Sequence, residues 1–309
     1  LPRASGMSSS SAFMIAVFLA IAHLNGLASD TRFRSAIGTS EDLAGYLATI
    51  ENGNSFGALA GDRGVGTFGG SEDHTAIVCC RPGTLSQYRF APVQRELEIG
   101  LPAGLAFVIA VSGVVAEKTG SALAAYNRAS RLAVRVLEAW NAATGRADQT
   151  LERAMTSAPD AVARMRNVLD RSTAPEFPAT VLRNRFEQFR TESLDIVPAA
   201  SEALRAGDLT RFGLLVDRSQ EAAEKWLGNQ IAETITLARS AREAGAVAAS
   251  AFGAGFGGSV WAIVPEDEVP QFSEAWSAAY RAAHPEAASR ATFFETRPGP
   301  SARRIEHLS

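Results

Sequence analysis

The sequence predicts an α+β protein in which two layers of strands and helices pack side by side. Two features lead to this prediction: strands occur before and after a long helical stretch, and no repeat or low-complexity linker interrupts that order. A chain of 309 residues is long enough for one large domain or two ordinary ones.

The composition excludes several classes of function. Apolar residues make up 46% of the chain and charged residues 20%, with a net charge of −3. Because there is no basic excess, we expect no nucleic-acid partner. Cys79 and Cys80 are adjacent and are interpreted as reduced core residues of a cytoplasmic protein. The histidines are too scattered for a zinc site.

An apolar run at residues 12–22 resembles the middle of a signal peptide. It follows four serines rather than a basic region, and it is too short to span a bilayer. We therefore interpret it as a buried helix and expect no membrane partner.

The rest of the first hundred residues predicts a hairpin. Residues 75–80 form its first strand, Arg81-Pro82-Gly83 its turn, and residues 86–93 its second strand. Before it lies a glycine-rich stretch at residues 53–70.

A continuous apolar run at residues 105–112 has the length of a buried strand and is expected to open a second domain. The boundary is placed within residues 96–104, which divides the chain into residues 1–98 and 99–309. Residues 121–245 have a helical pattern, because apolar side chains recur at every fourth position, as in Leu132, Val136 and Trp140. Strands return at residues 259–264 and 293–296, with a helix at residues 269–283 between them.

The first candidate functional motif is the string Pro-Arg-Ala-Ser-Gly-Met-Ser-Ser-Ser-Ser-Ala at residues 2–12, directly before the apolar helix. Small residues let the backbone approach a phosphate, and the N–H groups of a first helical turn have no intrahelical partners. Serine hydroxyls add donors, and one can also ligate magnesium. The alternative is a serine-rich helix cap.

A second glycine-rich loop, Phe-Gly-Ala-Gly-Phe-Gly-Gly-Ser at residues 252–259, leads into a predicted strand. It does not fit the dinucleotide-binding fingerprint, because it precedes a strand instead of joining a strand to a helix. Dense glycines allow close approach of another backbone. A tight turn packed under another element is the alternative reading.

Acidic residues follow the first glycine-rich stretch, where Glu72 and Asp73 come directly after Gly-Gly-Ser. Phosphoryl transfer to a hydroxyl needs a positioned acceptor, charge neutralisation and often a nearby carboxylate. The structural alternative for Asp73 is a helix-capping acid. Glu51 could ligate magnesium, or it could be an ordinary surface charge.

Taken together, these strings resemble the GHMP kinases, and within them the galactokinases. Residues 2–12 are similar to the phosphate motif Pro-x-x-x-Gly-Leu-Ser-Ser-Ser-Ala, with Met7 in place of leucine, and residues 253–258 are similar to the late motif Gly-Gly-Gly-Phe-Gly-Gly. Residues 203–209 and 212–215 resemble a helical stretch of galactokinases. Ser112-Gly113-Val114 and Tyr126-Asn127-Arg128 resemble the segment that carries a sugar-contacting tyrosine.

The resemblance implies a two-domain GHMP kinase fold. Residues 1–98 would be the remainder of an N-terminal domain like domain 2 of ribosomal protein S5. Residues 99–309 would form a ferredoxin-like α/β domain with a helical insertion.

The resemblance also implies roles for individual residues. Asp73 matches the catalytic aspartate, Gly70 and Tyr126 match residues that contact the sugar, and Ser10 and Glu51 match the magnesium ligands. The residues implied in binding ATP and its phosphates are Gly6, Ser8, Ser9, Ser10, Gly253, Gly255 and Gly257. The cofactors implied are ATP and Mg²⁺.

Three departures from the family pattern stand out. The usual Gly-Ile-Met-Asp-Gln is here Gly-Ser-Glu-Asp-His, so His74 either hydrogen-bonds substrate or packs. An insertion places Lys118 near the expected pocket, where it would meet a charged substrate or remain solvated. The family's N-terminal motif, Gly-Arg-Val-Asn-Leu-Ile-Gly-Glu-His-Thr-Asp-Tyr, has no counterpart, so we expect a fragment that lacks its N-terminal part.

The resulting functional hypothesis is an ATP-dependent kinase for a small-molecule sugar, with galactose phosphorylated at its anomeric hydroxyl. Two alternatives remain: a kinase for a related sugar such as arabinose, a heptose or galacturonate, and a non-catalytic sugar sensor. The changed residues around Asp73 favour the first of these alternatives, and the missing N-terminal motif favours the second.

Overall fold

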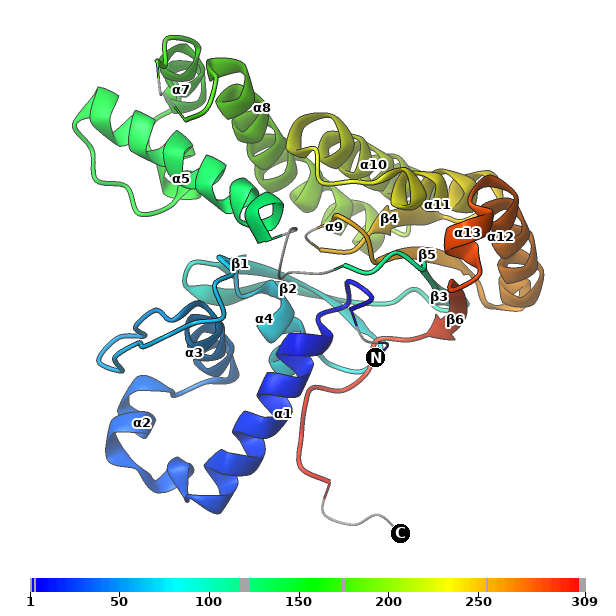
Figure 1. Cartoon of the computed structure of the whole chain (residues 1–309), viewed down its shortest axis with the longest axis horizontal. Coiled ribbons are helices and arrows are strands. Elements are labelled where there is room, and N and C mark those ends of the chain that lie inside the picture. Colours follow the sequence, from blue (N-terminus) through cyan, green and yellow to red (C-terminus); the bar gives the residue numbers. More distant parts are fainter. Residues whose placement is uncertain (1, 3, 117–122, 174–175, 254, 306–309) are drawn as a thin grey trace.

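A computed structural model gives the structure of the chain and describes residues 2, 4–116, 123–173, 176–253 and 255–305 (Figure 1). The α-helices are α1 (Ser9–Leu24), α2 (Thr31–Ala36), α3 (Ser40–Asn52), α4 (Glu72–Cys79), α5 (Leu123–Thr144), α6 (Leu151–Met155), α7 (Ala161–Asp170), α8 (Ala179–Arg190), α9 (Val197–Ala206), α10 (Leu209–Ala222), α11 (Ala232–Glu243), α12 (Val269–Ala283) and α13 (Pro285–Ala288). Short 3₁₀ turns are η1 (Leu27–Ser29) and η5 (Glu266–Glu268), and π-helical turns are η3 (Thr191–Ile196) and η4 (Ala223–Leu227).

The strands form two separate sheets. They are β1 (Thr84–Phe90), β2 (Val93–Gly100), β3 (Leu105–Val111), β4 (Ala248–Ala251), β5 (Ser259–Pro265) and β6 (Thr292–Thr296). β1 and β2 form an antiparallel hairpin, and the other four strands form an antiparallel sheet in the order β4-β5-β3-β6. The mixture of helices and strands confirms the α+β prediction.

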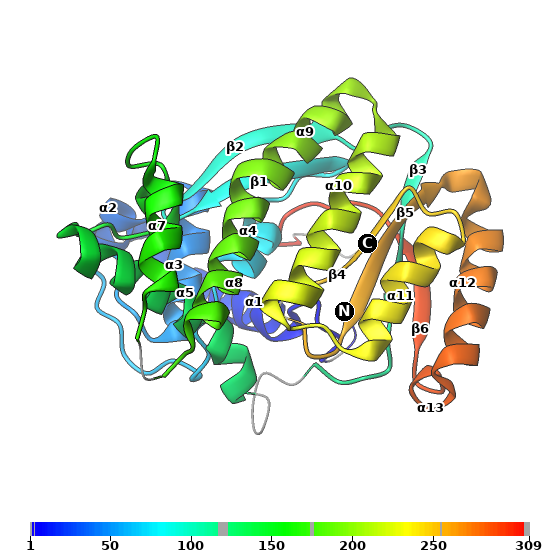
Figure 2. The same ribbon diagram turned by 90° about the horizontal axis from the view of Figure 1, so that it is seen from above.

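The larger sheet has the ferredoxin-like topology. Along the chain its elements follow the order strand, helices, strand, strand, helix, strand, since α5 to α11 separate β3 from β4, and α12 separates β5 from β6. The helices between β3 and β4 are the expected helical insertion. Figures 1 and 2 show α5, α7 and α8 at one end of the molecule and α11 to α13 at the other.

Both faces of β3 are buried, which explains its unbroken apolar sequence. One face contributes Ala106, Val108 and Ala110 to a core with residues of α11 and α12, including the fully buried Trp276. The opposite face contributes Leu105 to a core with residues of α9 and α10. The predictions of β3, β5, β6 and α12 are confirmed, whereas β4 was not predicted.

The helical insertion has a hydrophobic core of its own. Leu132, Val136 and Trp140, the three positions that predicted a helix, are all buried along α5 and pack with residues of α6 to α8. The helical interpretation of this region is confirmed.

The predicted first strand of the hairpin is wrong, because residues 75–79 belong to helix α4. Glu72 and Asp73 occupy the first turn, where carboxylates interact favourably with the helix dipole. Thr75 and Cys79 lie one turn apart on the buried side. The buried residues therefore follow a helical period and not an alternating one. Both cysteines are free, as expected.

The hairpin forms further along the chain than predicted. Its strands are β1 and β2, and Pro92 lies in the turn between them, where its missing N–H is not needed for the ladder. The predicted domain division between residues 98 and 99 falls within β2, which continues to Gly100. That division stays a prediction.

The apolar run at residues 12–22 does form a helix, α1, but the expectation that it is buried is wrong. Only Ser11 and Ile15 are buried, whereas Phe13 is 72% exposed and Ile21 is 55% exposed. A helix that is apolar on all sides has packed one side against α4 and η1. Among the described residues, no helix is long and apolar enough to cross a membrane.

Candidate functional site

The serine-rich loop leads into α1 with its first helical turn open. Ser8 occupies the N-cap position but makes no side-chain capping hydrogen bond. Its φ of 54° is left-handed, as is the φ of 50° at Ala4, and such values in non-glycine residues are costly and concentrate at ligand-binding sites. The start of α1 therefore has no side-chain cap from Ser8, an arrangement that is compatible with an anion at its N–H groups.

The late glycine-rich loop lies directly against the serine-rich loop that precedes α1, which is the phosphate-loop candidate. A β-carbon added at Gly258 would lie 2.8 Å from the Cα of Gly6, closer than side chains tolerate. The Ser259 hydroxyl donates a hydrogen bond of 2.5 Å to the carbonyl oxygen of Ser5. The structural alternative for the late loop is thus realised, since the loop packs against the phosphate-loop candidate. Its role in binding ATP stays a prediction.

The predicted glycines of the late loop have different neighbours. A β-carbon at Gly255 would collide with the carbonyl oxygen of Asn229, and one at Gly257 would lie 3.1 Å from the carbonyl oxygen of Val114. One at Gly253 would lie 3.8 Å from the carbonyl oxygen of Gly6. Close approach of backbone therefore requires glycine most strongly at position 255.

Three elements converge on the carboxylate of Glu51, at the end of α3. The Ser11 hydroxyl on α1 donates a hydrogen bond of 2.9 Å to Glu51 Oε2. Nε2 of His74 on α4 lies 2.9 Å from the same oxygen. The imidazole is buried, and neither of its nitrogens has an aligned hydrogen bond within the described residues, so this contact is one of proximity.

Sequence reasoning did not single out Ser11. The motif alignment placed the metal ligand at Ser10, which is exposed in the structure, whereas Ser11 is buried and faces Glu51. The signal that could have found it is the extra serine, because Ser11 is the one that directly precedes Ala12. Ser9 turns back to its own loop and accepts a hydrogen bond of 3.3 Å from the N–H of Ala4.

Ser11 and Glu51 fit a magnesium site that is completed by phosphates. Mg²⁺ commonly takes one or two protein oxygens and fills its remaining positions with phosphate oxygens and water. In the part of the chain that the structure describes, no group of three or more His, Cys, Asp and Glu side chains is placed to hold a metal ion. The paired hydroxyl and carboxylate supply oxygen donors next to the open helical turn.

Asp73 lies half-buried in the first turn of α4, one residue before His74. The adjacent loop brings Gly69 against the predicted sugar-contacting tyrosine, since a β-carbon at Gly69 would lie 3.0 Å from the hydroxyl oxygen of Tyr126. Gly70, which follows Gly69 in the chain, is exposed. The structure therefore places the Gly69–Gly70 segment beside both α4 and Tyr126.

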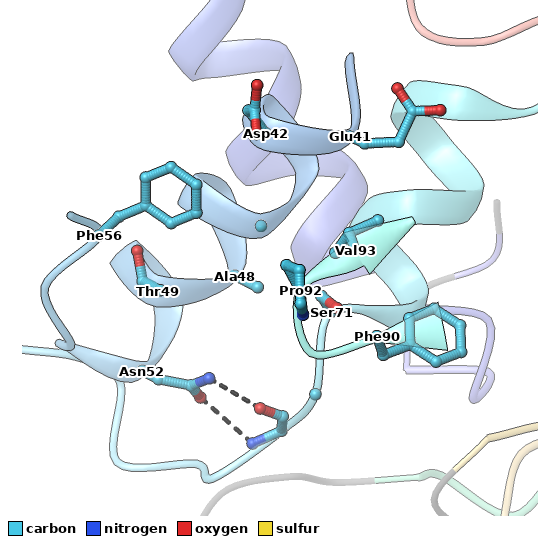
Figure 3. Close-up of a pocket in the computed structure, with 13 residues that line it drawn as sticks. Glu41, Asp42, Ala48, Thr49, Asn52, Phe56, Ser71, Phe90, Pro92 and Val93 are labelled. Carbon is cyan, nitrogen blue, oxygen red and sulfur yellow. Dashed lines mark hydrogen bonds between the residues drawn. The ribbon is translucent and has the colours of Figure 1, made fainter. Parts of the chain in front are cut away.

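A pocket of about 230 Å³ adjoins this segment (Figure 3). Its walls include Asn52, Phe56, Gly70 and Phe90. Among the described residues that line it, Asp73 and Tyr126 do not appear. Lys118, the other residue predicted near the pocket, lies outside the described part of the chain.

Comparison with known proteins bears on the fold that carries this site. Residues 200–282 match the family model for the C-terminal part of the GHMP kinases. These residues therefore correspond to the C-terminal part of that family, and the fold agrees with the GHMP kinase fold expected from the motifs.

Among solved structures, the chain is similar to galactokinase from Lactococcus lactis complexed with galactose. The TM-score is 0.74 at 21% identity, over 99% of this chain and 69% of that chain. Mevalonate kinase from L. major in complex with R-mevalonate matches at TM-score 0.44 and 16% identity, over 86% of this chain and 60% of that one. Homoserine kinase from Cytophaga hutchinsonii matches at TM-score 0.46 and 16% identity, over 97% of this chain and 68% of that one. A comparison with curated protein sequences gives no match.

Proposed function

We propose that this chain is an ATP-dependent kinase that transfers a phosphoryl group to a sugar hydroxyl, with galactose as the first candidate acceptor. The observation that carries the proposal is the convergence of Ser11, Glu51 and His74. It links the first turn of α1, which suits a phosphate, to the helix α4, whose first turn carries Asp73 and suits an acceptor hydroxyl.

In this mechanism the N–H groups at the start of α1 and the nearby serine hydroxyls hold the phosphates of ATP. Ser11 and Glu51 would hold Mg²⁺, which supplies neutralisation of phosphate charge when it is bound. Asp73 orients the acceptor hydroxyl and accepts its proton. The glycine loop at residues 253–258 supports the phosphate loop from below, as its contact with Gly6 indicates.

Galactose is favoured because the similar Lactococcus lactis structure was crystallised with that sugar. A related sugar is the second candidate, and a specific observation favours it. Between Glu51 and Asp73 the chain folds back on itself, so that a β-carbon at Gly64 would collide with the backbone of Asn52. Phe56, which belongs to the same folded-back segment, lines the pocket beside Gly70. This segment therefore shapes the pocket beside Gly70, which supports an acceptor other than galactose.

The test is sugar-dependent release of ADP from Mg–ATP, with galactose, arabinose, a heptose and galacturonate, for the wild type and Asp73→Asn. We expect turnover with one sugar, lost by about 10²–10⁴-fold in the variant, while calorimetry shows unchanged nucleotide affinity. Binding of sugar and nucleotide without ADP release would favour the sensor. Failure to bind Mg–ATP would contradict the proposal.

A further inference from the structure

Two asparagine side chains hydrogen-bond to the backbone of the loop at residues 66–69. Asn52 donates a hydrogen bond of 2.7 Å to the carbonyl oxygen of Gly69 and accepts one of 3.2 Å from its N–H (Figure 3). Asn127 accepts a bond of 2.9 Å from the N–H of Phe68 and donates one of 2.8 Å to the carbonyl oxygen of Gly66. Both hydrogen-bonding groups of the Gly69 backbone are therefore occupied by one side chain.

The chemistry of these contacts dictates the residue type. A primary amide presents a donor and an acceptor side by side, so it can satisfy an N–H and a C=O of the same loop at once. Aspartate has the same shape but no donor, and leucine has neither group. Asn127 is also buried, so loss of its partners would leave polar groups without water.

The two asparagines come from different parts of the fold. Asn52 ends α3, next to Glu51, whereas Asn127 lies on α5 of the helical insertion, next to Tyr126. The loop between them leads directly to Gly70 and then to Asp73 in the first turn of α4. The four hydrogen bonds thus fix the position of the Gly70–Asp73 segment relative to Tyr126.

We propose that Asn52 and Asn127 are positioning residues for the acceptor sugar. They hold the loop so that Gly70, Asp73 and Tyr126 face one acceptor, and they act on acceptor binding without acting on the nucleotide. This inference rests on the proposed kinase function, because it assigns these asparagines to the acceptor side of that reaction.

The chain contains a matched control for this arrangement, which we call a clamp because one asparagine amide hydrogen-bonds both an N–H and a carbonyl oxygen of the same backbone segment. Asn141 donates a hydrogen bond of 2.9 Å to the carbonyl oxygen of Asp148 and accepts one of 3.0 Å from its N–H. The arrangement is the same amide-to-peptide clamp. Asn141 lies fourteen positions after Asn127 on the same helix, roughly 21 Å further along its axis. The variant Asn141→Ala therefore measures the effect of losing such a clamp at a distance from the acceptor.

The experiment measures KM for the acceptor and for ATP in the wild type, Asn52→Ala, Asn127→Ala and Asn141→Ala. We expect the first two variants to raise the acceptor KM by about tenfold, the equivalent of one or two lost hydrogen bonds, with the ATP KM unchanged. Asn141→Ala should leave both constants at their wild-type values. An unchanged acceptor KM in Asn52→Ala, or an equal rise in the ATP KM, would overturn the proposal.

A measurement on the wild type alone tests the proposal even where the variants do not fold. Amide hydrogen exchange should be slow at Phe68 and Gly69, because their N–H groups are donated to asparagine side chains, and fast at the neighbouring exposed Gly70. Fast exchange at Phe68 and Gly69 would show that the clamp does not exist. If the wild type phosphorylates no sugar, the kinase proposal fails and the positioning role fails with it. If the wild type is active and the variants match it, only the positioning role fails.

Discussion

The carboxylate of Glu51, at the end of α3, accepts a hydrogen bond of 2.9 Å from the Ser11 hydroxyl in the first turn of α1. The two residues are forty positions apart in sequence. Their contact joins α1, whose first turn would hold phosphate, to α3, whose Glu51 would hold magnesium. It also distinguishes Ser11 from its neighbour Ser10, which is exposed.

The first prediction uses this difference. Ser11→Ala should raise the Mg²⁺ concentration needed for half-maximal ADP release by about tenfold, because a hydroxyl that contributes to the metal site is lost. Ser10→Ala should have a much smaller effect. A magnesium titration of both variants decides the point, and the reverse order of effects would return the metal-ligand role to Ser10.

The second prediction concerns the contact between the two glycine-containing loops. Gly258→Ala should lower the free energy of unfolding by more than Gly104→Ala does. Both positions have positive φ, +93° and +77°, so both variants share a backbone strain of about 1 kcal/mol. Only at Gly258 would the new methyl group also overlap another backbone, that of Gly6, which costs about 1–3 kcal/mol more.

Urea unfolding of the two glycine variants measures this difference. At Gly104 a β-carbon would meet nothing within 4 Å among the described residues, which makes it a suitable control. Equal losses of stability would mean that the loops do not pack as closely as described. Gly258→Ala should also weaken ATP binding, because it displaces the phosphate-loop candidate.

The third prediction is a pH dependence in the helical insertion. Burial alone raises the pKa of Glu187, but hydrogen bonds from Arg166 and Arg183 outweigh it and lower the pKa from 4.5 to about 2. A depressed carboxyl pKa stabilises the folded state above the unfolded pKa and loses that contribution as pH falls through the folded one. Stability should therefore decrease by about 2–3 kcal/mol between pH 4.5 and pH 2 from this residue.

Glu187→Gln isolates that contribution. The variant should be less stable than the wild type at pH 7, and the difference should shrink as the pH approaches 2. Denaturant unfolding across this range provides the measurement. A difference that stays constant with pH would show that Glu187 contributes by packing and not by its charge.

The fourth prediction concerns α1, whose two sides have opposite environments. Ile15 is fully buried, so Ile15→Ala should lower the free energy of unfolding by about 2–4 kcal/mol. Phe13 is 72% exposed, and Phe13→Ala should change it by less than about 0.5 kcal/mol. Comparable losses at the two positions would mean that the exposed side of α1 is covered in solution.

The fold could be predicted from the sequence where burial and periodicity agree. β3 was found because both of its faces are buried, and α5 because Leu132, Val136 and Trp140 lie on one buried stripe. α4 was assigned wrongly, because Ile77 and Val78 have high strand propensity and its eight residues are too short for a clear helical period. β4 consists mainly of alanine, which signals neither strand nor core.

The candidate site was predictable as a set of motifs but not as a set of contacts. The serine loop, the late glycine loop and the acids were visible in the sequence, and the structure brings the two loops together. The choice of Ser11 over Ser10 depends on which side of α1 meets α3. The roles of Asn52 and Asn127 depend on a loop whose path no local pattern determines.

The hydrogen bond from Ser259 to the carbonyl oxygen of Ser5 joins residues 254 positions apart. During synthesis the serine-rich loop leaves the ribosome 254 positions ahead of the serine that supports it. It cannot reach its final shape until β5 has been made and has closed against it. The serine-rich loop is therefore completed only after β5 has folded against it, and nucleotide binding should appear only once β5 is in place.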